Sequence, residues 1–244
     1  MQGTGSPFTV LALYRGIAVP AASAESVIDR VKSSGLEGDE GSWHFRVPNP
    51  ADVQRQVDAL LLHPGLSKND IFANASSPGI CACGDAAGAE YYAAQHNYSE
   101  ERNYPIMIEM SMPLEKAYVD SRDFLCAAFQ LWDRKSNQFV NRQENLLARL
   151  YGKHVLKYFR TACATQDQAT RIAMCNLASF DSRIIRAHYK NQLVIRGRYK
   201  TTFRSAFFVQ GPISPGYIKR ISVVENYLPI TPDVILSNFL DGLI

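Results

Sequence analysis

The order of segments along the chain limits the fold most: strand-like segments lie at both ends and enclose a helical middle. Apolar and β-branched residues predict strands over residues 8–19 and 103–113, and strand patterns return over 191–224. Residues 141–191 contain few helix breakers and predict consecutive helices. Because strands from distant parts of the chain must pair around these helices, the order predicts an α+β fold. We expect a single domain over residues 1–244, with the helical segment as an insertion.

Shorter segments give expectations that depend on one or two residues. Residues 21–35 predict a helix that ends at Gly35. Residues 70–76 predict a strand that leads into the glycine-rich segment PGICACGDAAG, and residues 203–224 predict a β-hairpin with a tight turn at Gly211-Pro212. The last segment, TPDVILSNFLDGLI, predicts a short helix that begins at Thr231.

Composition disfavours several classes of protein. No apolar run approaches the ~20 residues that a membrane-spanning helix requires. The start of the chain lacks a basic segment followed by an apolar one, which argues against a secretory signal. Five cysteines without a disulfide-like pattern, with Cys81 and Cys83 as an isolated pair, argue against a structural zinc site. We therefore expect a cytoplasmic protein with reduced thiols, no metal and no membrane contact.

Basic residues are concentrated near the C-terminal end. Residues 182–224 contain no Asp or Glu, although the net charge of the whole chain is only +3. The basic residues of this tract are Arg183, Arg186, Lys190, Arg196, Arg198, Lys200, Arg204, Lys219 and Arg220. Clustered Lys and Arg bind phosphates by displacing counterions, so a nucleic-acid partner is one explanation. The other explanation is a solvated face whose charge is balanced by acidic residues elsewhere in the fold. Both explanations remain open.

Several other chemistries lack the residues that they need. The five histidines are scattered and form no close metal-ligand pair. The glycine-rich segment does not match the dinucleotide pattern G-x-G-x-x-G. Cys126, Cys163 and Cys175 occur in apolar helical contexts that are typical of core residues, although a Cys/His nucleophile pair stays open.

Two stretches carry candidate binding residues. Tyr14, Arg15 and Gly16 end the first predicted strand, where an arginine could pair with a pyrophosphate and a glycine lets a ligand approach the backbone. A structural salt bridge is the alternative role for this arginine. In the second stretch, Asn74 and Ser76 lie on one face of a predicted strand.

The helix that follows the second stretch carries Tyr91 and Tyr92. Either ring could stack on a flat heteroaromatic group such as nicotinamide. Core packing is the alternative role for both.

Together with Ala206–Val224, these stretches resemble the ADP-ribosyltransferase family, which uses NAD and splits its nicotinamide–ribose bond. The last stretch is most similar to the DNA-targeting toxins of that family. The resemblance implies a split β-sheet core. It also implies an Arg or His on the first strand, a polar strand followed by a small-residue helix, and a Glu at the start of a late strand.

The sequence departs from the family pattern where the catalytic Glu is expected, because Ala206 occupies that position. The family's Glu holds the ribose 2′-hydroxyl and stabilises an oxocarbenium-like transition state, and alanine has no group that can do this. Also, Asn74-Ala75-Ser76 stands where many members carry Ser-x-Ser/Thr-x-Ser. Three explanations remain open: an inactivated form of an active enzyme, a pseudoenzyme that still binds NAD, or Glu225 as the true carboxylate.

The resemblance implies a mono-ADP-ribosyltransferase, acting as a toxin or defence enzyme, with NAD as co-substrate. Arg15 would hold the NAD pyrophosphate or its adjoining ribose, Ser76 would support the nicotinamide ribose, and Tyr92 or Tyr91 would stack near nicotinamide. Arginine-modifying members carry Gln or Glu two residues before the catalytic Glu, where this chain has Arg204, which argues against arginine as the acceptor. The basic tract and the resemblance to DNA-modifying toxins favour a nucleic-acid base, DNA or RNA, over a protein side chain.

The expected contacts to such an acceptor are Arg196, Arg198, Lys200 and Arg204. A toxin of this kind also implies a possible antitoxin or immunity partner. The rival interpretation is a non-catalytic basic module that binds RNA or a protein.

Overall fold

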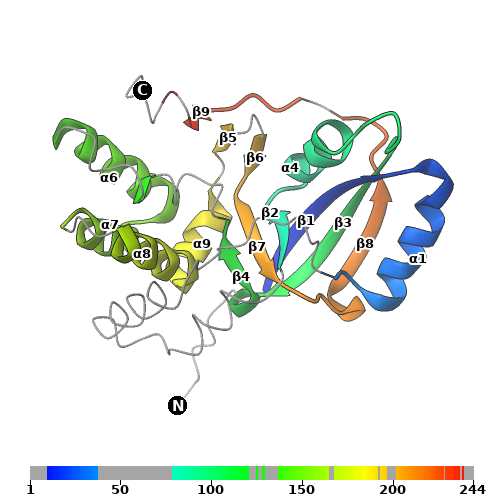
Figure 1. Ribbon diagram of the computed structural model, residues 1–244, viewed down its shortest axis with the longest axis horizontal. Helices are drawn as coiled ribbons and strands as arrows, with labels where there is room; N and C mark the ends of the chain where they lie inside the picture. Colours follow the sequence, from blue (N-terminus) through cyan, green and yellow to red (C-terminus); the bar gives the residue numbers. More distant parts are fainter. Residues whose placement is uncertain are drawn as a thin grey trace, which may run out of the picture.

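A computed structural model describes the following residues: 10–37, 79–120, 125, 128, 129, 137–164, 168–191, 193–196, 202–227, 229–236 and 238. Within these ranges the chain forms a six-stranded sheet, a three-stranded sheet and helices on both faces and at one edge (Figure 1). This mixture of helices and antiparallel strands confirms the α+β prediction. No helix of the described ranges is long and apolar enough to cross a membrane.

The six-stranded sheet is antiparallel throughout and has the order β4-β7-β2-β1-β3-β8. Its strands are β1 (Val10–Val19), β2 (Gly79–Cys83), β3 (Tyr104–Pro113), β4 (Ala117–Val119), β7 (Ala206–Gln210) and β8 (Ile218–Val223). Strands β1 and β3 pair along all ten residues of each, from Val10–Pro113 to Val19–Tyr104. In contrast, β1 and β2 pair only at Tyr14 and Cys83. The sheet therefore consists of two three-stranded halves that meet at one residue pair, with an opening between β1 and β2 beyond it.

The predicted hairpin over residues 203–224 is wrong. Strand β7 pairs with β2 and β4, whereas β8 pairs with β3 at the other edge of the sheet. The connection passes Ile213, which forms a bridge with Leu36, and the short 3₁₀ helix η5 (Pro215–Tyr217). Burial explains the difference, because the first four residues of β7 are buried and need neighbours on both sides, while β8 is partly exposed and suits an edge.

The glycine-rich segment PGICACGDAAG contains strand β2. All but one of its five residues are buried, between β7 and β1. A Cβ at Gly79 would lie 1.7 Å from the ring of Phe208, so the glycine makes room for this ring. The strand predicted over residues 70–76 lies outside the described residues.

Helices cover the two faces of the sheet at β1. Helix α1 (Ala24–Ser34) is preceded by the 3₁₀ turn η1 (Ala21–Ser23), and its Val31 belongs to the same apolar cluster as Leu11 and Leu13 of β1. It ends at Gly35, whose φ of 82° favours glycine, and this confirms the prediction of its C-terminus. Helix α4 (Ala86–Tyr91) continues into the π-helical segment η2 (Tyr92–His96) on the other face.

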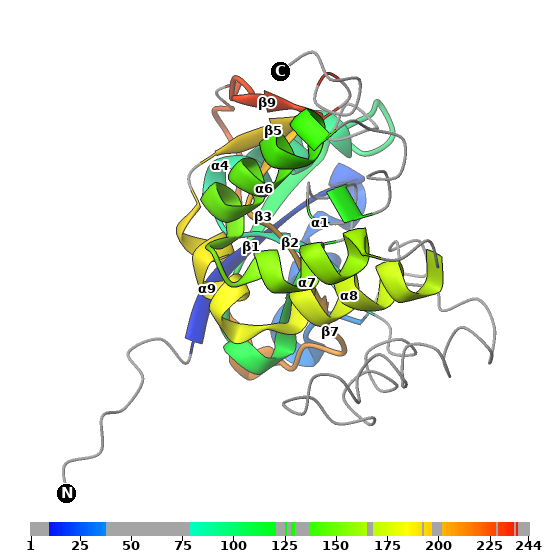
Figure 2. The ribbon, with the colours of Figure 1, turned by 90° about the vertical axis from the view of Figure 1, so that its left-hand side faces the viewer.

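The predicted helical middle is confirmed and begins slightly earlier than expected. It consists of α6 (Asn137–Tyr151), α7 (Val155–Cys163), α8 (Gln168–Phe180) and α9 (Ser182–Lys190). These helices gather at the β4–β7 end of the sheet, and Figure 2 shows them facing the viewer. Their buried side chains form one apolar cluster that includes Phe129, Phe159 and Ala206.

A small second sheet lies beyond the N-terminal end of β7. It has the order β6-β5-β9, with β5 (Val194–Arg196), β6 (Thr202–Arg204) and β9 (Val234–Ile235). The helix predicted from Thr231 is therefore wrong over 231–235, because β9 pairs in parallel with β5. Asp233 directs this pairing: its carboxylate accepts a bond from the Val194 N–H at 2.9 Å, and its own N–H donates to the Val194 carbonyl at 2.9 Å.

Candidate functional site

One row of paired residues crosses five strands of the large sheet. Ala206 pairs with Cys83, Cys83 with Tyr14, Tyr14 with Glu109, and Glu109 with Arg220. Directly paired residues point to the same face of a sheet. Tyr14 and position 206, far apart in the sequence, therefore share one face, and this face carries helix α4.

Ala206 is enclosed in the protein interior. It is 1% exposed, and its carbonyl accepts bonds from the Asp120 N–H at 3.0 Å and from Nε2 of the fully buried His188 at 2.8 Å. The His188 ring stacks on Tyr151 and meets Phe207 edge to face. Asp120 follows β4 opposite Ala206 and is itself 2% exposed. Position 206 thus lies beside a buried carboxyl group.

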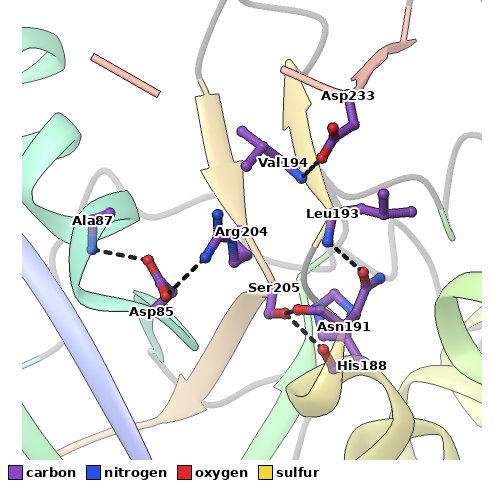
Figure 3. A network of polar contacts seen from close by, with 9 residues as sticks. All are labelled: Asp85, Ala87, His188, Asn191, Leu193, Val194, Arg204, Ser205 and Asp233. Atoms are coloured by element: carbon purple, nitrogen blue, oxygen red, sulfur yellow. Dashed lines mark hydrogen bonds and ion pairs between the residues drawn. The ribbon is translucent and has the colours of Figure 1, made fainter. Parts of the chain in front are cut away.

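The residues just before Ala206 are fixed by polar contacts (Figure 3). Ser205 has a positive φ of 49°, and its Oγ lies 2.6 Å from the His188 carbonyl oxygen and 2.9 Å from that of Asn191. Arg204 forms an ion pair with Asp85, with Nη1 and Oδ2 3.2 Å apart. Asp85 also caps helix α4 by accepting a bond from the Ala87 N–H at 2.9 Å. Arg204, predicted to contact substrate, therefore joins β6 to the start of α4.

The basic tract does not form one continuous face. Arg196 is exposed on β5, whereas Lys219 and Arg220 are exposed on β8, at the sheet edge farthest from β4. Arg183 forms an ion pair with Asp181 at the start of α9, with Nη2 and Oδ2 2.9 Å apart. Arg198 and Lys200 lie outside the described residues.

Arg15 points away from the face that carries Tyr14, since adjacent residues of a strand alternate between faces. Its Nη1 donates a bond of 2.9 Å to the Cys81 carbonyl, across the opening between β1 and β2. The carbonyl of the next residue, Gly16, accepts a 2.9 Å bond from Nδ2 of Asn97. Arg15 is therefore held in the opening of the sheet.

Gly16 allows close contact between β1 and helix α4. A Cβ at this position would lie 1.8 Å from the Ala89 carbonyl oxygen and 2.7 Å from the Ala93 nitrogen. The sequence predicted that Gly16 lets a ligand come close to the backbone. In the structure, helix α4 is the element that comes close to Gly16.

A groove of about 700 Å³ opens on the Arg15 side of β1. Its walls are β1, helix α1 and the loop between η2 and β3. The polar lining includes Arg15, Arg30, Arg102 and Asn97, and Ile17, Val19, Val27 and Val31 give it an apolar part. The sequence did not single out Arg30, Arg102 or Asn97, because no local pattern relates three arginines on separate elements.

Tyr91 and Tyr92 are half-buried and are not among the residues that line the groove. Their rings meet edge to face, with centroids 5.9 Å apart. Tyr92 also contacts His96 and packs against the helical core, whereas Tyr91 contacts Tyr227. Burial, and then the proximity of Tyr91, raises the pKa of Tyr227.

Burial and nearby acidic residues affect the pKa of Tyr14. Burial, and then the charge of Glu109, raises the pKa of Tyr14 above its usual value. Burial and the charge of Asp85 similarly raise the pKa of Glu90 on helix α4. Glu225, the alternative catalytic carboxylate, is exposed and lies five residues beyond Arg220, or roughly 15 Å farther along the direction of β8. This separates Glu225 from the Ala206 end of the row.

Asn74 and Ser76, predicted to support the nicotinamide ribose, lie outside the described residues. The strand that leads into helix α4 is β2, so Cys81, Ala82 and Cys83 occupy the place expected for the polar strand. The described ranges contain no group of three side chains suited to a metal ion. No protein-family model matches the chain, and no curated protein matches it significantly.

Proposed function

We propose that the chain is an NAD-dependent mono-ADP-ribosyltransferase of the cytoplasm in a form that lacks its catalytic carboxylate. One observation carries the proposal. Arg15 on β1, the tyrosine-bearing helix after β2 and Ala206 at the start of β7 come from three distant segments and lie on or beside three neighbouring strands of the sheet, in the order β1, β2 and β7.

The arrangement gives each element a chemical role. The guanidinium of Arg15 suits the diphosphate of NAD, because arginine forms paired, charge-assisted bonds to phosphate oxygens. A carboxylate at 206 would stabilise the ribosyl cation as the bond from C1′ to nicotinamide breaks and nicotinamide leaves with the bonding electrons. The acceptor would then attack C1′ and lose a proton.

A nucleic-acid base remains the favoured acceptor, with a protein side chain as the alternative. Arg196 on β5 is exposed near the N-terminal end of β7 and could contact a phosphate backbone there. Arg198 and Lys200 follow it in the sequence and extend the same basic segment. A protein partner that neutralises such a toxin is part of this proposal.

A second candidate function, a non-catalytic binding module, is favoured by the burial of position 206. Ala206 is 1% exposed and lies beside Asp120, and Arg15 points to the opposite face of β1. A module of this kind would have no affinity for NAD.

Exchange of Ala206 for Glu tests the catalytic proposal, with Ala206→Gln as a variant of the same shape without the charge. Each protein is incubated with NAD and separate pools of DNA, RNA and protein. We expect nicotinamide release and a mass gain on one pool with Ala206→Glu alone. If the folded Ala206→Glu variant binds NAD but releases no nicotinamide, position 206 is not the site of the missing carboxylate.

A further inference from the structure

We propose that the groove between β1, α1 and the loop before β3 binds a diphosphate group, held jointly by Arg15, Arg30 and Arg102. Sequence patterns suggested Arg15 alone. The other two arginines come from separate elements and are brought to the same groove by the fold.

Arg15 forms the inner end of the site. It is partly buried, and the bond from Nη1 to the Cys81 carbonyl fixes the direction of its guanidinium. A side chain that is held before the ligand arrives loses less conformational entropy when it binds. Asn97, whose amide is anchored on the Gly16 carbonyl, lines the same part of the groove.

Arg102 and Arg30 form the two outer walls. The backbone of Arg102 is fixed by reciprocal bonds with Ser99, of 3.1 Å from the Ser99 N–H and 3.2 Å from the Arg102 N–H. The Ser99 hydroxyl accepts a further bond of 3.1 Å from the Arg102 N–H. Arg30 projects from the last turns of helix α1. Glu37 is the single acidic residue among the described residues that line the groove.

The balance of three guanidinium groups against one carboxylate selects an anion with more than one charge. Guanidinium matches phosphate oxygens in a fixed fork geometry, and a diphosphate presents enough oxygens for three such groups. The apolar part of the groove, formed by Ile17, Val19, Val27 and Val31, can hold an organic group attached to the phosphates. Its volume of about 700 Å³ lies in the usual range for small-molecule sites, which favours a nucleotide over a nucleic-acid strand.

The inference rests on the proposed function only for the identity of the natural ligand. Diphosphate binding needs no carboxylate at position 206 and no nicotinamide pocket. It can therefore hold even if the chain does not use NAD.

Titration calorimetry with inorganic pyrophosphate, and then with ADP and NAD, tests the site. We expect saturable pyrophosphate binding at low salt that the double variant Arg30→Ala/Arg102→Ala weakens at least about tenfold, since each removed group forms charge-assisted bonds. The variant Arg142→Ala/Arg149→Ala removes the same charge from exposed positions on helix α6 and should leave binding unchanged. Glu37→Gln should strengthen binding, because it removes the acidic residue from the groove lining.

The outcomes separate this proposal from the proposed function. Pyrophosphate binding that depends on Arg30 and Arg102, without NAD binding, would support the diphosphate site and count against the NAD-dependent enzyme. If the binding of NAD and of pyrophosphate is the same in the double variant and in the α6 control, both ligands bind elsewhere and the diphosphate site is overturned. The site is also overturned if pyrophosphate does not bind more tightly than about 1 mM, or if both double variants weaken it equally.

Discussion

Gly16 is the residue at which strand β1 and helix α4 come into direct contact. Gly16→Ala would place a methyl group 1.8 Å from the Ala89 carbonyl oxygen, so helix and strand must move apart. We expect a loss of about 3 kcal/mol in the free energy of unfolding, measured by urea denaturation. Gly216→Ala is the matched control, because the nearest atom to its new Cβ, Ser214 Oγ, is 3.9 Å away. Equal effects of the two changes would contradict the contact.

Position 206 should tolerate a carboxylate only at a cost in stability. Ala206→Glu adds a charge to a site that is 1% exposed and beside Asp120, so we expect a loss of about 3 kcal/mol at pH 7. Burial and the neighbouring carboxyl should raise the pKa of the introduced group above its unfolded value. Its destabilising effect should then shrink as the pH falls below the folded-state pKa.

Urea denaturation of Ala206→Glu and Ala206→Gln between pH 7 and pH 5 checks this expectation. The Gln variant should lack the pH dependence. A carboxylate that costs no more stability than the amide at pH 7 would contradict the burial of this site. Many functional groups are retained at such a cost, so lower stability together with restored activity would support the catalytic proposal.

At the scale of the elements, Asp181 fixes the start of helix α9. Its carboxylate accepts bonds of 2.9 Å from the Arg183 N–H and the Tyr158 hydroxyl and forms an ion pair with Arg183. Although burial acts in the opposite direction, these bonds lower the pKa of Asp181. A lowered folded-state pKa stabilises the protein above the unfolded pKa, and this stabilisation is lost as the pH falls through the folded pKa.

Asp181→Asn should therefore cost about 1–2 kcal/mol at neutral pH, and the difference from the unaltered protein should disappear in acid. Asp181→Ala removes the helix cap as well and should cost more. Thermal unfolding followed by circular dichroism from pH 7 to pH 3 measures both effects. A cost for Asp181→Asn that does not change with pH would show that the charge of Asp181 is not involved.

Strands and helices with clear patterns could be predicted from the sequence, but their partners could not. The ends of β3 and α1 follow local signals such as Gly35, which adopts a conformation that favours glycine. Strand β2 was missed because the suitability of Gly79 for a strand depends on the ring of Phe208, about 130 residues later. The hairpin over residues 203–224 was wrongly predicted for the same reason. The pairing of β7 depends on which distant strands can bury it on both sides.

At the scale of the whole molecule, the fold joins residues that no sequence spacing relates and separates others that are close in the sequence. Arg15 could be predicted because an arginine at the end of a first strand is a local feature. Arg30 and Arg102 could not, because their proximity to Arg15 depends on how α1 and the loop before β3 pack around β1. Conversely, Arg196 and Arg220 belong to one basic tract of the sequence but lie on different sheets.

Binding of NAD to the unaltered chain is the most direct test of the account. We predict that NAD raises the free energy of unfolding, by about 2.7 kcal/mol at a concentration of 100 times its dissociation constant. Arg15→Ala should abolish this shift while the protein stays folded, and the exposed control Arg149→Ala should retain it. A chain that shows no shift with NAD at any accessible concentration would contradict the account and favour the non-catalytic binding module.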